Sequence, residues 1–198
     1  GSDLYLSYSR YREAFDRCEA GAGIDLKAAC FRGEGMETSD VIQPAIYAHS
    51  VATLCQLEAE GVSADFLAGL SLGEYAALTA AGVLDEAQGA HLVRRRGALM
   101  DGAVPPGTGG MLSVVGLTLE QVEAAIVGRA NIFVSNHLSE TQLVLGGLLP
   151  ELEAVKPALE AAGSRMLTML AMKGPSHCPL LNEAADQFEK ELSGEALF

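Results

Sequence analysis

The sequence predicts an α/β fold in which a smaller βαββαβ unit is inserted into a larger subdomain. Three features of the 198 residues lead to this prediction. An apolar run at 66–70 leads through a tight turn into an alanine-rich helix, prolines and glycines interrupt the chain at 105–110, and strand and helix patterns then alternate in the βαββαβ order. We therefore expect residues 1–106 and 172–198 to form the larger subdomain and 107–171 the smaller one.

Two helices are expected before the apolar run. From Asp3 onward, apolar and aromatic residues recur at steps of four and three, which places them on one helix face. These residues are Leu4, Tyr8, Tyr11, Phe15 and Cys18. Asp40 can cap a second helix, apolar or small on most sides and therefore largely buried, which Gly61 stops.

The rest of the chain alternates between strand and helix patterns. Residues 66–70 read as a strand, 74–81 as a helix, and Asp85 begins a helix that runs to Met100. Beyond the break we expect strands at 111–115, 132–135, 142–145 and 166–170, with helices at 119–127, 150–162 and 181–192. The order from 111 to 170 is that of the ferredoxin-like split unit.

Composition excludes several classes of function. Hydrophobic residues make up 49% and charged residues 20%, the balance of a globular protein. The net charge is −13, and the basic residues cluster only at Arg94, Arg95 and Arg96, so nucleic acid is not an expected partner.

The cysteines, the hydrophobic runs and the two ends of the sequence bear on where the protein is located and on how much of a longer protein this chain represents. The four cysteines lack metal-ligand spacing, so no metal site is expected, and no signal peptide or membrane span is visible. We expect a cytoplasmic protein with free thiols. Because Gly1 begins almost at a helix pattern and Phe198 follows a helix without a capping element, we also expect N-terminal and C-terminal segments of a longer protein to be missing.

The segment from Gly69 to Gly73, with the sequence Gly-Leu-Ser-Leu-Gly, matches a nucleophile elbow. In that motif a serine sits on a cramped turn between a strand and a helix, and the glycines let the backbone pass without Cβ clashes. Here the serine is Ser71. The backbone N–H of Leu72, at the helix start, would point toward a developing oxyanion.

A serine nucleophile needs a base, and histidine suits this task near neutral pH. Of the four histidines, His49 and His91 fall inside helices and His137 ends a strand of the smaller unit. His177 lies in a glycine- and proline-shaped loop where the chain leaves that unit, so it is the preferred base. No aspartate is convincingly placed for a triad, and a Ser71–His177 dyad is the simpler proposal.

Arg96 differs from its two arginine neighbours. It is followed by Gly97, whose missing side chain permits close packing, so its guanidinium could be buried and bind a carboxylate with two hydrogen bonds. Arg94 and Arg95 are expected on a solvated helix face.

Around these residues the sequence resembles the malonyl-CoA:acyl carrier protein transacylases and the acyltransferase domains of fatty acid and polyketide synthases. The resemblance is carried by the segments 43–45, 69–75, 81–85, 96–100 and 175–178, and runs through essentially the whole chain. It implies an α/β-hydrolase-like large subdomain with an inserted ferredoxin-like small subdomain. The family usually begins with a further strand and a glutamine-containing loop, and continues well beyond the residue that matches Phe198.

Carried over position by position, the resemblance implies that Ser71 is acylated, His177 moves the proton and Arg96 pairs with the malonyl carboxylate. The implied substrate is malonyl-CoA, no cofactor is needed, and the acceptor is the phosphopantetheine thiol of acyl carrier protein. Leu70, in place of the commoner histidine, and Ser176 are the expected substrate-binding neighbours of the two catalytic residues.

The strand end at 136–140 departs from the family pattern. Asn136 is expected in the acyl pocket, with a turn hydrogen bond as the open alternative. We expect a monomer.

Three other functions stay open at this point. Water in place of a thiol acceptor would make the protein a serine hydrolase of thioesters. A chain without catalytic power would be an acyltransferase remnant that binds carrier protein. A cysteine enzyme using Cys178 is disfavoured, because a nucleophile adjacent in sequence to its histidine usually points away from it.

Overall fold

The structure is a computed structural model that describes residues 1–194 of the chain. These residues form an α/β fold with a small antiparallel sheet. Contacts between residues divide the chain into two compact units: unit 1 comprises Gly1–Ala98 and Phe188–Phe198, and unit 2 comprises Leu99–Gln187. The expected insertion, 107–171, lies entirely inside unit 2. Because compact units and subdomains need not share boundaries, the subdomain boundaries themselves stay a prediction.

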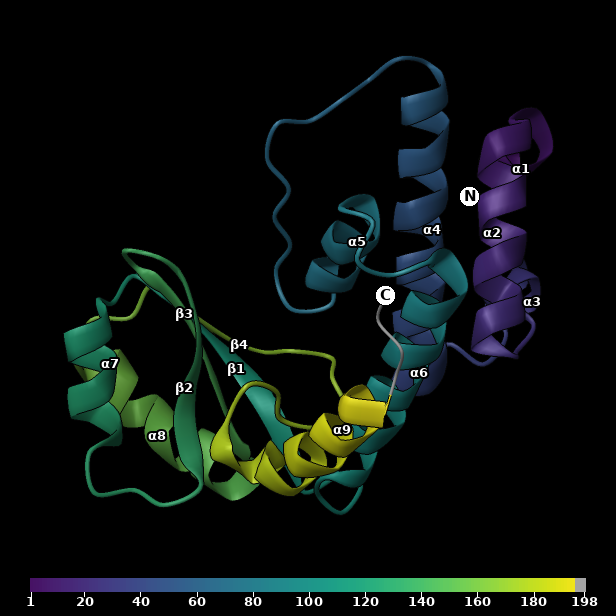
Figure 1. Cartoon of the computed structure of the whole chain (residues 1–198). Helices are drawn as coiled ribbons and strands as arrows, with labels where there is room; N and C mark the ends of the chain where they lie inside the picture. The colour runs from purple at the N-terminus through teal and green to yellow at the C-terminus, as the bar shows by residue number, and fades with distance from the viewer. Residues whose placement is uncertain (195–198) are drawn as a thin grey trace. The chain divides into compact units, whose positions relative to one another are not determined.

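Unit 1 is helical in its described residues, apart from the loops that join the helices (Figure 1). Its helices are α1 (Ser2–Ser7), α2 (Ser9–Ala22), α3 (Leu26–Arg32), α4 (Ser39–Ala59), α5 (Gly73–Ala80) and most of α6 (Glu86–Gly102). The expectation of one continuous helix from Asp3 onward is wrong, because the backbone at Tyr8 is extended (φ −122°) and separates α1 from α2. Serines flank Tyr8, and serine favours helix caps over helix interiors.

Helix α3 has no counterpart among the expected elements. It is seven residues long, too short for a hydrophobic period to stand out. Asp25 caps it: the Asp25 carboxylate accepts a hydrogen bond from the backbone N–H of Ala28 at 2.7 Å. A local capping signal was therefore present where periodicity was not.

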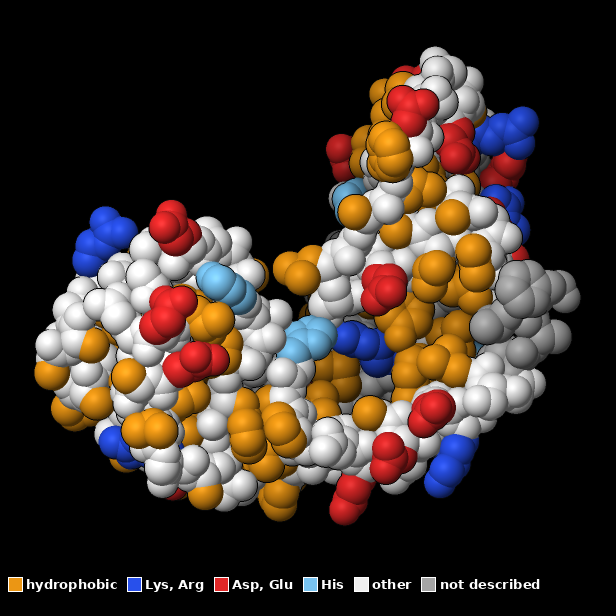
Figure 2. Space-filling model, turned by 60° about the vertical axis from the view of Figure 1, so that its left-hand side comes forward, with side chains coloured by type: hydrophobic (Ala, Val, Ile, Leu, Met, Phe, Trp, Pro, Cys, Tyr) orange, Lys and Arg blue, Asp and Glu red, His pale blue; other side chains and the backbone are white. Residues whose placement is uncertain are grey.

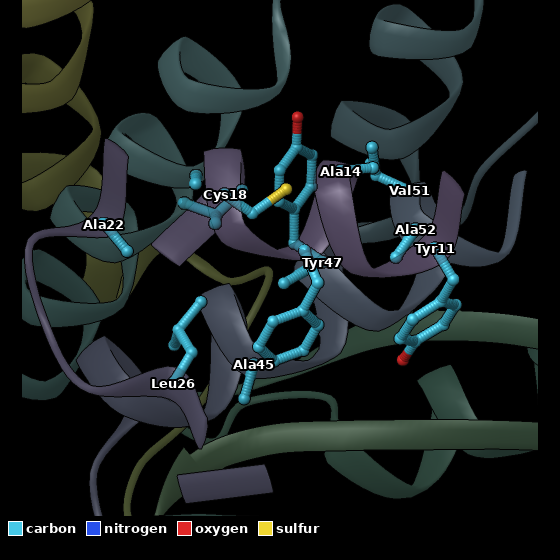
Figure 3. Close-up of a cluster of buried hydrophobic side chains, with 13 residues drawn as sticks. Tyr11, Ala14, Cys18, Ala22, Leu26, Ala45, Tyr47, Val51 and Ala52 are labelled. Carbon is cyan, nitrogen blue, oxygen red and sulfur yellow. The ribbon is translucent and has the colours of Figure 1, made fainter. Parts of the chain in front are cut away.

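The core of unit 1 forms where α2 packs against α4 (Figure 3). Tyr11, Phe15 and Cys18 of α2 are at most 1% exposed, which confirms the buried face expected from their spacing. Tyr8 was expected on the same face but is 41% exposed, because the chain is extended there. Tyr47 of α4 is buried among these side chains. Each buried side chain of this size stabilises the fold by roughly 1.5–3 kcal/mol, so α4 is held firmly on α2.

Residues 66–70 do not form the expected strand. They belong to the loop between α4 and α5, and Phe66 is 94% exposed (Figure 1). A strand needs a neighbour to satisfy its backbone hydrogen bonds, and the described part of unit 1 contains no strand. The turn and the helix that follow do form, since α5 begins at Gly73.

Unit 2 contains the sheet. Its strands are β1 (Gly109–Val115), β2 (Ile132–Ser139), β3 (Gln142–Leu148) and β4 (Met166–Met169), paired antiparallel in the order β2-β3-β1-β4. Helices α7 (Leu119–Ile126) and α8 (Leu149–Ala161) contact the sheet and share one apolar core with it. The expected βαββαβ order is confirmed.

Two features of the sequence stabilise the sheet and helices of unit 2. Thr118 begins α7 with a capping box, in which the Thr118 and Gln121 side chains each accept a hydrogen bond from the other residue's backbone N–H. Apolar side chains that alternate along β1 and β3, such as Leu112 and Leu145, are fully buried under the helices.

The last described elements are a short 3-10 helix, η1 (Pro179–Leu181), and α9 (Asn182–Gly194), close to the expected helix at 181–192. Within residues 1–194, no helix is long and apolar enough to cross a membrane. On the face shown in Figure 2, acidic side chains (red) are scattered and basic side chains (blue) form no continuous patch.

Candidate active site

Ser71 lies in a strained turn that leads directly into α5. Its φ of 54° is in the left-handed region, which residues with a Cβ rarely occupy. Hydrogen bonds of the i→i+3 type tighten the turn, the first from the N–H of Gly73 to the carbonyl of Leu70 at 2.9 Å. Strain of this kind persists only where the surrounding structure enforces it, and it is common at active sites. The turn has the backbone geometry that a nucleophile elbow requires.

The two glycines of the motif differ in their structural role. A Cβ on Gly69 would lie 2.0 Å from the carbonyl carbon of Gly73 and 2.3 Å from the backbone nitrogen of Glu74, so only glycine fits. A Cβ on Gly73 would meet nothing within 4 Å. Of the two glycines, Gly69 is therefore the one whose missing Cβ lets the backbone come close to residues 73 and 74 at this turn.

The guanidinium of Arg96, on α6, contacts the nucleophile candidate directly. Its Nη2 donates a hydrogen bond to Oγ of Ser71 at 2.9 Å, and its Nη1 donates to Oε1 of Gln43 at 2.7 Å. The Tyr75 ring lies 5.9 Å from the Arg96 Cζ, within the range of a cation–π interaction. Groups from α4, α5 and the elbow thus surround one cation beside the serine.

A close helix contact brings Arg96 to this position. A Cβ on Gly97 would lie 2.3 Å from the backbone carbonyl oxygen of Ser39, so α6 approaches the start of α4 at backbone distance. Ser39 and Gln43 are one turn apart on the same face of α4. Arg96, the residue before Gly97, is therefore placed next to Gln43.

The hydrogen-bond partners of Arg96 are neutral, and the acidic side chain whose charge acts on it is Glu74 of α5. Among the ion pairs of the described residues none includes Arg96. Burial lowers the pKa of Arg96 from its ordinary value, because desolvation disfavours the charged form. The guanidinium stays protonated even so, since an arginine side chain is not deprotonated in proteins. A carboxylate would be a better partner than either neutral acceptor.

The two neighbouring arginines serve the structure. Arg95 is exposed and forms a two-bond ion pair with Glu191 at 2.7 and 3.0 Å. Arg94 donates to the backbone carbonyl of Ala22 at 2.7 Å and is half-buried, not on the solvated face that we expected. The difference arises because α6 packs against the end of α2, which leaves the Ala22 carbonyl within reach.

The two leucines that flank Ser71 differ in how far they are exposed. Leu70 is 70% exposed, whereas Leu72 packs against the apolar core of unit 1. Leu72 is also the N-cap of α5, so its backbone N–H lies at the helix start. Its role as an oxyanion donor stays a prediction.

In unit 2, His177 lies in a loop that is held tightly on the sheet. Pro175 and Ser176 are buried, and each packs against a strand glycine: a Cβ on Gly109 would lie 2.5 Å from Cδ of Pro175, and one on Gly146 would lie 3.1 Å from the Ser176 carbonyl oxygen. His177 itself is exposed and has a φ of 53°. Of the described residues other than glycine, only Ser71, Asn131 and His177 have positive φ.

The other residues of interest in unit 2 are also located. Asn136 is half-buried on β2, opposite Val144, at a break in the strand register. His137, next to it, is exposed. Since Asn136, Ser176 and His177 lie in unit 2 and Ser71 lies in unit 1, the pairing of the two catalytic candidates stays a prediction.

Two alternatives from the sequence, His49 and Cys178, are less supported by their surroundings. His49 shares a hydrogen bond with the Tyr11 hydroxyl at 2.7 Å, a structural contact within unit 1. Burial raises the pKa of the Cys178 thiol, which disfavours the reactive thiolate. Among the described residues, no group of three or more His, Cys, Asp or Glu side chains is arranged to hold a metal ion.

Comparison with known proteins decides the family. The sequence model described as the acyl transferase domain matches residues 1–197. The chain belongs to the acyl transferase domain family. The expected resemblance is confirmed.

The relatives that this acyl transferase domain matches include proteins named malonyl CoA-acyl carrier protein transacylase. The malonyl CoA-acyl carrier protein transacylase of Escherichia coli (strain K12) is 36% identical over 97% of the chain. The crystal structure of the transacylase of that name from Clostridium perfringens is 33% identical, covers 98% of the chain and has a TM-score of 0.92. The chain spans 64% of the length of the first relative and 63% of the second.

A further solved structure is described as a type II PKS acyl-carrier protein in complex with its malonyl-transacylase. It is 37% identical, with a TM-score of 0.91, and covers 98% of this chain and 64% of that one.

Sequence reasoning missed Gln43 as a site residue of this acyl transferase domain. It entered only as part of a shared segment, yet its amide contacts Arg96 directly. A usable signal existed: glutamine stands in a helix whose other residues on that side are apolar or small, and a buried amide needs a partner.

Proposed function

We propose that this protein transfers a malonyl group from malonyl-CoA to the phosphopantetheine thiol of acyl carrier protein through a malonyl-serine intermediate. The observation that carries the proposal is the guanidinium of Arg96, which has neutral partners and donates to Oγ of Ser71. The names of the relatives support the same substrate and acceptor.

The first half of the reaction forms the acyl-enzyme. His177 takes the proton of Ser71, Oγ attacks the thioester carbonyl, and the C–S bond breaks to release coenzyme A. The Leu72 N–H, at the start of α5, donates to the oxyanion while the tetrahedral intermediate exists. In the second half the acceptor thiol attacks the serine ester, and Ser71 recovers its proton.

Selectivity for a malonyl group follows from charge. The malonyl carboxylate accepts two hydrogen bonds from Arg96 and pairs with its charge in a half-buried setting. An acetyl group has no carboxylate, so it would leave the arginine with neutral acceptors only. The substrate's own carboxylate thus adds binding energy close to the reacting carbonyl.

The finer architecture and setting belong to the same proposal. The strand order β2-β3-β1-β4 supports a ferredoxin-like small subdomain at 107–171, and the elbow at Ser71 supports an α/β-hydrolase-like large subdomain formed by 1–106 and 172–198. We place Leu70, Asn136 and Ser176 around the acyl group. A cytoplasmic monomer that needs no cofactor completes the proposal.

A two-step labelling experiment tests this function. The protein is incubated with malonyl-CoA labelled in the malonyl group, freed of coenzyme A, and then mixed with acyl carrier protein that carries its phosphopantetheine arm. We expect the label on the protein first and on the carrier protein afterwards, with Ser71→Ala unlabelled throughout. Release of free malonate in place of transfer would indicate a hydrolase. A folded protein that takes up no label would be a non-catalytic remnant.

A further inference from the structure

The hydroxyl of Tyr47 lies where three helices of unit 1 meet. Tyr47 belongs to α4, is 1% exposed and is part of the buried cluster in Figure 3. Its hydroxyl shares a hydrogen bond of 2.7 Å with Oγ1 of Thr79 on α5. Helix α6 leaves room for the phenol, because a Cβ on Gly89 would lie 2.0 Å from the Tyr47 hydroxyl oxygen. The phenol therefore contacts α5 and α6 at once.

In this hydrogen bond Tyr47 is the donor. A threonine hydroxyl carries one proton, and Thr79 donates it to the backbone carbonyl of Tyr75 at 3.1 Å. Oγ1 of Thr79 is then left to accept from Tyr47. Burial raises the pKa of Tyr47, so its phenol stays protonated and able to donate. A chain of two hydrogen bonds thus runs from the core of unit 1 to Tyr75, whose ring lies beside Arg96.

Helix α5 needs a directional contact because little of it is buried. It is eight residues long and none of its residues is buried, whereas α4 and α6 each contain several buried residues. Tyr75 and Ala76 pack partly against the core of unit 1, but apolar contact is non-directional and lets a short helix rotate about its axis. A hydrogen bond has a preferred angle, so the bond from Tyr47 to Thr79 fixes that rotation.

The same phenol also meets the helix that carries Arg96. Gly89 and Arg96 are both on α6, about two helical turns apart, so they lie on the same face of that helix. Tyr47 contacts both α5 and α6, and Ser71, in the turn before α5, accepts the 2.9 Å hydrogen bond from Arg96. The geometry between the nucleophile and the guanidinium therefore depends on where Tyr47 holds the two helices.

We propose that Tyr47 is a positioning residue for the nucleophile: by donating to Thr79 it fixes the rotation of α5, and so determines where the elbow presents Ser71 relative to Arg96. This inference rests on the proposed function. Tyr47 acts through α5, and Gly89 takes part because any side chain there would displace the phenol. Loss of the Tyr47 hydroxyl should therefore slow acylation of Ser71 while the protein stays folded.

Two variants, each with a matched control, test this. Tyr47→Phe removes the donor, and its control Tyr11→Phe removes a second buried phenol hydroxyl, which bonds from α2 to α4. Thr79→Val removes the acceptor. Its control Thr53→Val removes a threonine hydroxyl that also donates to the carbonyl four residues earlier, but within α4. Rapid-quench mass spectrometry gives the rate of the first acylation at saturating malonyl-CoA for each variant.

We expect Tyr47→Phe and Thr79→Val each to slow the first acylation about tenfold, since a small displacement of a nucleophile is costly. The double variant should be no slower than the slower single one, because both changes break the same bond. Thr79→Ser keeps the hydroxyl and should keep the wild-type rate.

A purely structural role would give a different pattern. It would lower the melting temperature in Tyr47→Phe and Tyr11→Phe alike and leave the acylation rate of the folded protein unchanged. If Tyr47→Phe acylates within about twofold of the wild-type rate, or Tyr11→Phe slows as much, the proposal is wrong. Should Tyr47→Phe fail to fold, the threonine variants decide, and Thr79→Val as fast as Thr79→Ser overturns the proposal.

Hydrogen exchange separates this inference from the proposed function. The backbone amides of α5, residues 73–80, should exchange faster in Tyr47→Phe than in wild type or Tyr11→Phe, and this measurement needs no acyl group. A wild type that takes up no malonyl label would end the proposed transfer, whereas the exchange of α5 would still report on Tyr47. Unchanged exchange of residues 73–80 in Tyr47→Phe would overturn the role of Tyr47.

Discussion

The guanidinium of Arg96 and the hydroxyl of Ser71 are linked by a hydrogen bond of 2.9 Å in which the arginine is the donor. Because Oγ is the acceptor, the hydroxyl proton is directed to a different acceptor. A cation at this distance also favours the alkoxide that forms when the proton leaves. When a carboxylate reaches Arg96 it competes with Oγ for the same donor. The contact thus connects acyl recognition to the nucleophile itself.

The elbow predicts opposite outcomes for its two glycines. Gly69→Ala forces a Cβ to within 2.3 Å of the backbone at Gly73 and Glu74, so Ser71 must shift. We expect acylation to slow by about 100-fold or more, since displacement by roughly 1 Å costs that much. Gly73→Ala, with open space around its Cβ, is the matched control and should retain most activity. Equal rates for the two variants would contradict the proposed geometry.

The proposed base gives a prediction about rate. His177→Ala should slow formation of the acyl-serine by about 10²- to 10⁴-fold, the usual contribution of a general base, with the fold retained because the side chain is exposed. His137→Ala, also exposed in unit 2, should leave the rate unchanged. Rapid-quench measurement of the adduct checks both variants. A slow His137→Ala and a fast His177→Ala would reverse the assignment.

The contact between α6 and α4 predicts a loss of stability. Gly97→Ala puts a Cβ 2.3 Å from the Ser39 carbonyl oxygen, so the helices must separate. Overpacking of this kind costs roughly 1–3 kcal/mol of unfolding free energy. Gly102→Ala, at the end of the same helix with nothing within 4 Å, should change stability by less than about 0.5 kcal/mol. Urea unfolding compares the two, and a neutral Gly97→Ala would show that the helices are not in backbone contact.

An ion pair between α2 and α6 predicts a dependence on pH. The hydrogen bond from Arg17 to Glu86, 2.7 Å long, lowers the pKa of Glu86 below its ordinary value of 4.5. A depressed carboxyl pKa stabilises the fold above the ordinary value, and this stability is lost as the pH falls through the folded-state pKa. Glu86→Gln should therefore cost up to about 1 kcal/mol at pH 7.

The difference between Glu86→Gln and wild type should shrink as the pH is lowered below 4.5. Glu13→Gln is a suitable control, because the Arg10–Glu13 pair is exposed on both sides. Urea midpoints at several pH values check this. A gap that stays constant down to low pH would show that the ion pair contributes nothing to stability.

Sequence reasoning found the local features and missed those that depend on distant neighbours. The turn at Ser71 is marked by Gly69 and Gly73, and the close packing beside Arg96 is marked by Gly97. Both features were therefore visible in the sequence. The strands and helices between 109 and 169 follow regular periodicities and capping signals, and were predicted in the right order.

The misses have physical causes. Residues 66–70 are apolar enough for a strand, but strand formation depends on a partner elsewhere in the chain. Gln43 is 53 positions away from Arg96, and no spacing rule links the two. The extended backbone at Tyr8 arises from flanking serines that the hydrophobic pattern does not register.

The most direct test of the account compares wild type with Arg96→Ala in competition between malonyl-CoA and acetyl-CoA, with the adduct on Ser71 read by intact mass. Arg95→Ala serves as the control, because Arg95 pairs with Glu191 on the surface. We predict that wild type and Arg95→Ala carry mainly malonyl groups and that Arg96→Ala carries mainly acetyl groups. An Arg96→Ala protein that still prefers malonyl would contradict the central claim that this guanidinium recognises the substrate's carboxylate.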